Sequence, residues 1–328
     1  MSKRINLVDG DIIAFRAAAA NEKRSVLVKH LPTGKEKAFD TRTDFRKMLK
    51  GKKGDNWKDY EQDYFFTDVQ EAADVSHALA TIRNQLDKLK SSTGASRQEI
   101  FVGGSENFRS TLPLPTQYKG SRGDFLRPVH LIEAKHYLEH TKKAEISVGI
   151  EADDLLSIRG YEILKEGHEP VICSLDKDTY QGSGLSIYNW TDQMPEVFKV
   201  PDTGYLVDLG KQGIKGCGFK FLCFQLIWAD PVDNYKATEV AGIRYGAKSA
   251  FKDLNSLTTN AELCNKVVEK FKLWYPGDVQ YTSWSGAAIK TDWKGMLDLY
   301  YKCVYMLREH NDKITWEEFF LEKGWHAN

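Results

Sequence analysis

The sequence has few of the features that accompany disulfide chemistry or structural zinc. It contains five cysteines in 328 residues, with no CxxC pair and no His/Cys cluster. An odd number of isolated cysteines predicts buried apolar side chains in a reducing compartment. The five are Cys173, Cys217, Cys223, Cys264 and Cys303.

Long hydrophobic runs and the common hydrolase motifs are also missing. No stretch approaches the ~20 apolar residues of a membrane span, and the start MSKRINLVDGDIIAF has no apolar run of signal-peptide length. We therefore expect a cytoplasmic protein that does not contact membranes. The HExxH, P-loop and GxSxG patterns do not occur, and no nucleophile triad is evident, which argues against those classes of enzyme.

The chain carries no net charge, because its 46 basic residues balance its 46 acidic residues. A simple DNA-coating protein would be more basic, although local clusters of charge matter more than the sum. The length fits one large α/β domain with a helical appendage, or two closely joined domains. Hydrophobic residues make up 41% of the chain, which predicts a globular fold.

Short apolar runs alternate with helical patterns in the first half of the chain. Residues 5–8, 99–102 and 170–175 predict buried strands, and residues 145–148 predict a shorter one. Helices are predicted between them, at residues 11–20, 69–90, 128–141 and 151–167. This alternation predicts an α/β fold with a mostly parallel central sheet flanked by helices.

The remaining segments suggest how the chain is organised. We expect a catalytic core over residues 1–210, with 21–66 as an insertion that starts with a hairpin and 105–127 as a polar, basic segment. Residues 211–328 are expected to be helical. Within them, ATEVAGIRYGAKSAFKDL predicts a helix, a tight turn and a second helix, and the last 70 residues predict helices packed on the core.

Acidic residues gather at the predicted strand ends and helix starts. In parallel sheets the carboxyl ends of the strands form one ligand-binding edge. Clustered carboxylates repel each other unless a cation lies between them, and Mg²⁺ prefers oxygen ligands. Two such ions about 4 Å apart can act on one phosphodiester. The groups are Asp9 with Asp11; Glu151, Asp153 and Asp154; Asp176 and Asp178; and Asp230 and Asp233.

Each motif alone also has an ordinary structural explanation. DxD pairs are common on surfaces, acidic residues at a helix start complement the helix dipole, and Asp176-Lys-Asp178 is compatible with a turn. The metal hypothesis therefore depends on all four groups occurring in order, with the basic segment between them.

The ordered motifs resemble those of bacteriophage 5′→3′ exonucleases and flap endonucleases, related to the 5′-nuclease domain of bacterial DNA polymerase I. The resemblance covers roughly residues 1–20 and 100–255, and it rests on LVDGD, NFR, YKGSR, GIEADDLL, SLDKD, ADPVDNY and GIRYGAKSA. It implies a PIN-like fold and two-metal hydrolysis of DNA, with two Mg²⁺ ions for which Mn²⁺ can substitute.

The resemblance also assigns roles to residues. It places Asp9, Glu151, Asp153 and Asp154 at a first metal and Asp176, Asp178, Asp230 and Asp233 at a second. Tyr118, Lys119 and Arg122 resemble a gateway segment against the scissile phosphate, where the cations neutralise charge and the ring stacks on a frayed base. Arg16 resembles an arginine of the first helix that lies near the cut strand.

The helix-turn-helix segment is expected to hold duplex phosphates. The turn at Gly246 exposes backbone amides at a helix start, and Gly242, Gly246 and Lys248 are the candidate DNA contacts, with K⁺ as a further ion. Taken alone, the segment is equally compatible with an ordinary interhelical turn. The family implies a DNA duplex with a 5′ end or flap as substrate. It also implies a phage single-stranded-DNA-binding or replication protein as partner, a role in phage replication or recombination in the host cytoplasm, and a monomer.

One position departs from the family. Gly104 stands after the second strand, in FVGGSENFR, where an aspartate of the first metal site is usual. Either Glu106 reaches in from the loop, or water replaces the missing ligand. The departure keeps an alternative open, in which the chain is a DNA-binding protein of the same fold with weakened or no catalysis. A metal-dependent ribonuclease and an α/β scaffold with acidic surface clusters are further alternatives.

Overall fold

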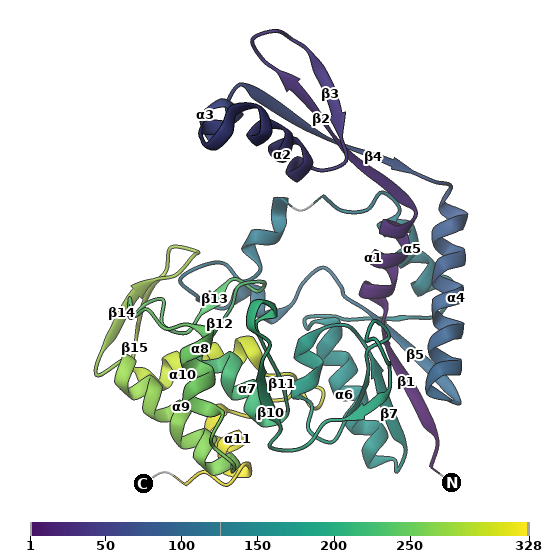
Figure 1. Cartoon of the computed structure of the whole chain (residues 1–328). Helices are drawn as coiled ribbons and strands as arrows, with labels where there is room; N and C mark the ends of the chain where they lie inside the picture. Colours follow the sequence, from purple (N-terminus) through teal and green to yellow (C-terminus); the bar gives the residue numbers. More distant parts are fainter. Residues whose placement is uncertain (1, 125, 327–328) are drawn as a thin grey trace. The chain divides into compact units, whose positions relative to one another are not determined.

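The computed structural model describes residues 2–124 and 126–326 and, within them, the side chains other than those of Arg122 and Asp124. The chain forms two compact units (Figure 1). The first contains residues 1–12, 86–125 and 138–328, and the second contains residues 13–85 and 126–137. The division after residue 210 that we predict from the sequence falls inside the first unit and stays a prediction.

The first unit is built on a six-stranded sheet in the order β6-β5-β1-β7-β8-β9. Every neighbouring pair is parallel except β8 with β9. The predicted α/β fold with a mostly parallel central sheet is therefore confirmed. The strands are β1 (Arg4–Asp9), β5 (Arg97–Val102), β6 (Glu145–Ile146), β7 (Glu169–Cys173), β8 (Ser186–Tyr188) and β9 (Val197–Lys199).

Burial explains why β1 lies in the middle of this sheet. Ile5, Leu7 and Val8 are fully buried, as is typical of a strand covered on both faces. Helix α6 (Ala152–Lys165) packs across β1, β5 and β7, and its Leu155 and Leu156 join Ile5 and Leu7 in one core. This packing fixes the first turn of α6 relative to the sheet.

A second core in the same unit surrounds α7 (Gly218–Ile227). Every residue of α7 is buried, which explains why its sequence is apolar all round. The other helices are α8 (Ala247–Leu254), α9 (Asn260–Trp274), α10 (Trp293–Val304) and α11 (Trp316–Glu322). Three two-stranded sheets complete this part: β10 (Tyr205–Asp208) with β11 (Ile214–Cys217), β12 (Ala229–Asp230) with β13 (Tyr235–Lys236), and β14 (Val279–Thr282) with β15 (Ala288–Thr291).

Two sequence expectations for this region are wrong. The predicted helix before Gly246 is a series of turns over residues 237–242, so α8 has no helical partner on that side. Thr238 donates its hydroxyl to the carbonyl of Ile243 at 2.9 Å and Gly242 has a φ of 65°; both oppose a helix. The C-terminal region also contains the β14–β15 hairpin, which turns near Gly286 and interrupts the expected helices.

The second unit contains an antiparallel sheet in the order β3-β2-β4. The predicted hairpin is confirmed as β2 (Glu22–His30) with β3 (Glu36–Phe39). The helix predicted at 69–90 begins later, because β4 (Tyr64–Ala72) pairs with β2 along its whole length and α4 (Val75–Thr93) follows. Helices α1 (Gly10–Ala20) and α4 each have residues in both units. The second unit also contains α2 (Arg42–Lys53), α3 (Trp57–Glu61) and α5 (Leu131–His136).

Short helical turns connect these elements. They are η1 (Gly54–Asn56), η2 (Phe108–Thr111), η3 (Gly120–Asp124), the π-helical η4 (Tyr137–Thr141), η5 (Lys177–Gln181) and η6 (Gly210–Gln212). All five cysteines are buried and free, as expected. In the described part of the chain, no helix is both long and apolar enough for a bilayer crossing.

Candidate metal centre

The strand order brings three acidic motifs to one edge of the sheet. Asp9 is the last residue of β1, and Asp176 follows the neighbouring β7 by three residues. These strands run parallel, with Val8 paired to Cys173, so both carboxylates leave the sheet at the same end. Glu151 caps α6, which places Asp153 in the first turn of a helix packed on the same strands.

The first carboxylate group consists of Asp9, Glu151, Asp153 and Asp176. Burial, together with the charges of Asp11 and Asp176, raises the pKa of Asp9 to about 7. Burial also raises the pKa of Asp153 well above its usual value, with the charges of Asp176 and Asp9 as the next causes. Asp176 has a raised pKa because of its burial and the charge of Asp233. The strand ends and the start of α6 place these carboxylates at one edge of the sheet, where repulsion between them adds to the effect of burial.

Few groups of the protein offset the charge of Asp9. Its two carboxylate oxygens accept the backbone N–H of Ile12 at 3.1 Å and the hydroxyl of Ser174 at 2.8 Å. Both donors hold the carboxylate in place, but neither carries a positive charge. A buried carboxylate held only by neutral donors is costly when ionised, and a bound cation would remove that cost.

The second carboxylate group consists of Asp178, Asp230 and Asp233. One ligand atom from each lies within 4.8 Å of the others, so this triad could hold a metal ion. Burial and the charge of Asp176 raise the pKa of Asp178 to about 6. Burial also raises the pKa of Asp233, with the charges of Asp178 and Asp230 adding to it.

The second group has more polar partners than the first. Lys177 forms an ion pair with Asp230 and lies 3.6 Å from Asp178. The side-chain amide of Gln225, on α7, donates to Asp178. The backbone N–H of Val232 donates to Asp230 at 2.9 Å. Three polar partners of the carboxylates were not predicted from the sequence. Ser174 and Lys177 lie inside the SLDKD motif, whereas nothing in the sequence marks Gln225.

Tyr118 and Lys119 connect the two groups. The Tyr118 hydroxyl donates to Asp233 at 2.9 Å and to Glu151 at 3.3 Å. The ammonium of Lys119 pairs with Glu151 and lies 3.8 Å from Asp233. The Lys119 backbone has a φ of 54° and donates its N–H to the carbonyl of Asp233 at 2.9 Å. A strained backbone held by the acidic cluster is typical of functional sites.

The structure gives Tyr118 a different surrounding from the one we expected. Only 5% of the residue is exposed, so no face of the ring is available to stack on a base in this conformation. Burial and the charges of Glu151 and Asp233 raise the pKa of the Tyr118 phenol, which keeps it a proton donor. Tyr118 therefore holds two carboxylates in place.

The carboxylate of Asp154 forms an ion pair with an arginine. Both of its oxygens accept from the guanidinium of Arg109, at 2.6 and 2.9 Å, and both residues are buried. Arg109 also donates to the carbonyl of Tyr305 at 2.6 Å, and the N–H of Leu307 donates to Asp154 at 3.2 Å. The assignment of Asp154 to a metal stays a prediction, but these contacts give it a structural role.

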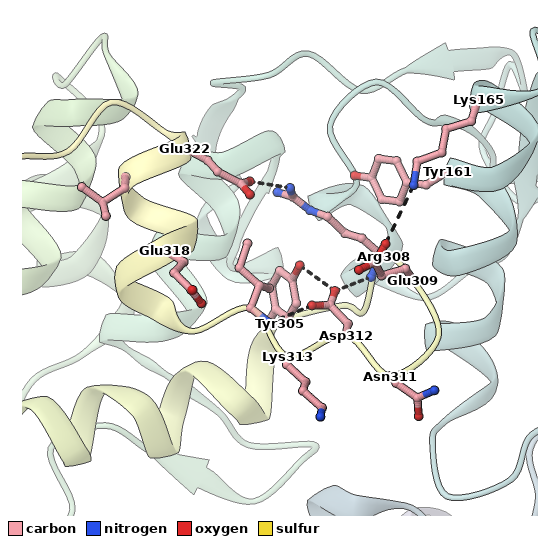
Figure 2. Close-up of a pocket in the computed structure, with 12 residues that line it drawn as sticks. Tyr161, Lys165, Tyr305, Arg308, Glu309, Asn311, Asp312, Lys313, Glu318 and Glu322 are labelled. Atoms are coloured by element: carbon pink, nitrogen blue, oxygen red, sulfur yellow. Dashed lines mark hydrogen bonds and ion pairs between the residues drawn. The ribbon is translucent and has the colours of Figure 1, made fainter.

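The segment that receives Arg109 also lines a groove at the far end of α6. Figure 2 shows this groove, which has a volume of about 940 Å³. Several of its polar groups have partners within the protein: Arg308 pairs with Glu322 at 2.9 Å, and Asp312 accepts from the hydroxyl of Tyr305 at 3.0 Å. These contacts hold the segment after α10, which lines the groove, and we assign no ligand to the groove.

The remaining predicted residues do not belong to either carboxylate group. Arg16 is an exposed residue of α1 in the second unit, and the side chain of Arg122 lies outside the described part. Gly246 caps α8, Lys248 lies in its first turn, and Gly242 lies in the turns before it. Glu106 is exposed, and among the described residues no hydrogen bond or ion pair joins it to the cluster.

Comparison with known proteins gives distant structural similarities. No family model matches the chain, and no curated protein matches it. Similar solved structures include bacteriophage T5 5′-exonuclease with bound zinc, at 15% identity and a TM-score of 0.44, covering 94% of this chain and 100% of that one. A T5 flap endonuclease in a complex with DNA and metal ions has 15% identity and a TM-score of 0.46, covering 92% and 98%. Because these similarities are weak, the functional argument rests on the site itself.

Proposed function

We propose that this protein is a metal-dependent nuclease that hydrolyses DNA phosphodiester bonds from a 5′ end or at a 5′ flap. The observation that carries the proposal is the pair of carboxylate groups at one edge of the sheet, with Lys119 between them. The 5′ polarity and a role in phage DNA replication or recombination rest on the resemblance of the motifs. A host cytoplasmic location and a monomeric state are part of the same proposal.

The donor set suits Mg²⁺, with Mn²⁺ as a substitute. Oxygen atoms are the only side-chain donors in either group, as hard divalent cations require. Asp178, Asp230 and Asp233 would hold one ion, and Asp9, Glu151 and Asp153 would hold the other. Asp176, which the motif resemblance assigns to the second ion, would lie between the two, because its charge acts on carboxylates of both groups. When bound, such ions lower the pKa of water and offset the charge that develops on the phosphate.

Lys119 has the position of an electrostatic catalyst. Its ammonium contacts carboxylates from both groups, so a phosphate lying over the centre would meet this cation as well. A fixed positive charge at that point stabilises the developing negative charge on a non-bridging phosphate oxygen. Arg122 and Arg16 are proposed to contact the same strand.

Helix α8 is the proposed contact for the uncut duplex. Gly246 gives the helix a start without a side-chain cap, so no cap side chain accepts from the first amides of α8. Backbone amides at a helix start bind phosphate, and Lys248 adds a charge beside them. Gly242 and a K⁺ ion would complete this contact. A phage single-stranded-DNA-binding or replication protein is the proposed partner.

The proposal is tested with a labelled 5′-flap DNA, a blunt duplex and an RNA version of the flap. Each is incubated with the wild type or Asp176→Asn, in Mg²⁺, Mn²⁺ or EDTA. We expect cleavage of DNA by the wild type with either metal, and a rate at least about a hundredfold lower for the variant. Glu106→Gln serves as the matched acidic control and should cut normally.

Three outcomes would contradict the proposal. Cleavage that survives EDTA, or that is equal in the wild type and Asp176→Asn, would remove the metal centre from the mechanism. Flap binding without cleavage in either metal would instead support a non-catalytic DNA-binding protein. Preference for the RNA substrate would support a ribonuclease.

A further inference from the structure

The loop after β5 leaves the sheet at the same edge as the metal centre. Strand β5 pairs with β1, with Phe101 opposite Asp9, and Gly103 and Gly104 follow the strand directly. The motif resemblance leads us to expect a carboxylate at residue 104. The structure shows why that residue is glycine and what lies there instead.

Gly104 has no room for a side chain. A Cβ atom on this residue would lie 2.1 Å from the carbonyl oxygen of Ser147, well inside van der Waals contact. The backbone N–H of Gly104 donates to the hydroxyl of Ser147 at 3.0 Å, which holds the two segments together. An aspartate at residue 104 would therefore require the backbone itself to move.

The carboxylate of Asp11 lies against the same glycine loop. Its Oδ2 accepts the backbone N–H of Gly103 at 2.8 Å. A Cβ atom on Gly103 would lie 2.7 Å from that same oxygen. Asp11 therefore fills the space into which a side chain at the end of β5 would project, and the absence of side chains on Gly103 and Gly104 makes its position possible.

Asp11 is also close to the first carboxylate group. It lies two residues after Asp9, in the first turn of α1. The backbone N–H of Ile12, the residue after Asp11, donates to Asp9 at 3.1 Å, so both carboxylates belong to the same tight turn at the start of α1. A carboxylate has about four lone-pair positions, so accepting one backbone N–H is compatible with binding a cation.

We propose that Asp11 supplies the first metal site with the carboxylate that Gly104 does not provide. The ligand is delivered from the first turn of α1 instead of from the end of β5, and the N–H of Gly103 orients it. Hydrogen bonds that orient ligands in this way tune metal affinity. This inference rests on the proposed function, because it concerns the same metal centre.

The test measures metal binding without DNA and without turnover. Asp178→Asn is used as the background, so that the first group dominates the binding of Mn²⁺ followed by titration calorimetry. Adding Asp11→Asn keeps an oxygen that can accept from Gly103 but removes the charge. We expect the Mn²⁺ affinity to fall by at least about tenfold. Asp11→Glu, which restores a carboxylate, should bind more tightly than Asp11→Asn.

A matched control and a folding check accompany the titration. Glu106→Gln removes a nearby exposed carboxylate and should leave the affinity unchanged. Thermal unfolding in EDTA should show that Asp11→Asn remains folded. If it does not, Asp11→Glu decides, because a purely structural role would not make its Mn²⁺ affinity exceed that of the Asn variant at equal folded fraction.

The outcomes separate this inference from the proposed function. If the background protein binds Mn²⁺ and Asp11→Asn binds it equally well, Asp11 is only a structural anchor and the inference is wrong, while the proposed nuclease stands. If affinity falls instead with Glu106→Gln, the substitute ligand is Glu106. If neither the wild type nor the background binds Mn²⁺, both proposals fall together.

Discussion

The two carboxylate groups of the centre differ in how the protein compensates their charge. In the second group, Asp230 pairs with Lys177, Asp178 accepts from Gln225, and Asp233 accepts from Tyr118. In the first group, the partners that the structure describes for Asp9 are a hydroxyl and a backbone N–H, neither of which is charged. Burial also raises the pKa values of Asp178 and Asp233, so a cation would relieve repulsion in both groups, and we expect the larger relief at Asp9.

Neighbouring residues on α6 show the same contrast. Asp153 belongs to the first group, and burial with nearby carboxylates raises its pKa, against the opposing charge of Lys119. Asp154, the next residue, is fully buried but is bound through both oxygens by Arg109. A single helical turn therefore carries one carboxylate available to a ligand and one satisfied by the protein.

The largest expected effect concerns the compensated carboxylate. Arg109→Met leaves Asp154 buried without its partner, and we expect the free energy of unfolding to fall by about 3–5 kcal/mol. Urea denaturation in EDTA measures it. Combining Arg109→Met with Asp154→Asn should recover part of the loss, since the unpaired charge is gone. A loss below about 1 kcal/mol for the single variant would show that the pair is not what holds this turn.

Metal addition should distinguish the first group from the rest of the protein. At about 100 times its Kd, a ligand that binds only the native state adds about 2.7 kcal/mol of stability. We expect Mg²⁺ to stabilise the wild type, and expect Asp153→Asn to raise the Tm in EDTA while reducing the gain from Mg²⁺. A Tm in EDTA that drops on this substitution would show that the first group is not strained.

In the second group, replacing a carboxylate by an amide should lower the metal-free stability instead of raising it. Asp233→Asn removes the charged acceptor of the Tyr118 hydroxyl and weakens the contact with Lys119. We expect a loss of about 1–3 kcal/mol in EDTA, measured by the same denaturation. If Asp153→Asn and Asp233→Asn shift the metal-free stability in the same direction, the comparison between the groups fails.

A further expected effect is the dependence of stability on pH. The pKa values of Asp9 and Asp178 are raised to about 7 and about 6 from an ordinary value of 3.8. The native state then holds more protons than the unfolded state between those values, so stability falls as pH rises from about 4 to about 7. We expect the metal-free Tm to decrease over this range, and Asp9→Asn to flatten the decrease. A metal-free Tm that rises throughout would contradict these shifts.

Local patterns in the sequence were sufficient to predict much of the fold. The strands at Asp9 and Asp176 are short apolar runs whose parallel pairing follows from the helices between them, and the strand ends place their carboxylates. The turns at residues 237–242 were missed because an apolar helical spacing was outweighed by Thr238 and Gly242. The β14–β15 hairpin was missed although its β-branched and aromatic residues and the turn at Gly286 favour strands.

The site was predicted less completely than the fold, since contacts distant in sequence set it. Neither the bidentate contact of Arg109 with Asp154 nor the burial of Tyr118 follows from a local pattern. The importance of Gly104 depends on Ser147, 43 residues away along the chain. Residue type and spacing thus identified the carboxylates, while tertiary packing decided which of them have partners.

The contacts that join Arg109 and Asp154 to Tyr305 and Leu307 have a consequence for synthesis of the protein. During translation, the acidic residues of the centre leave the ribosome long before residues 305–307 do. Until then Arg109 lacks its carbonyl acceptor and Asp154 lacks one of its amide donors, so the first turn of α6 is incompletely anchored. A nascent chain would therefore complete the anchoring of this turn only after residues 305–307 have been synthesised.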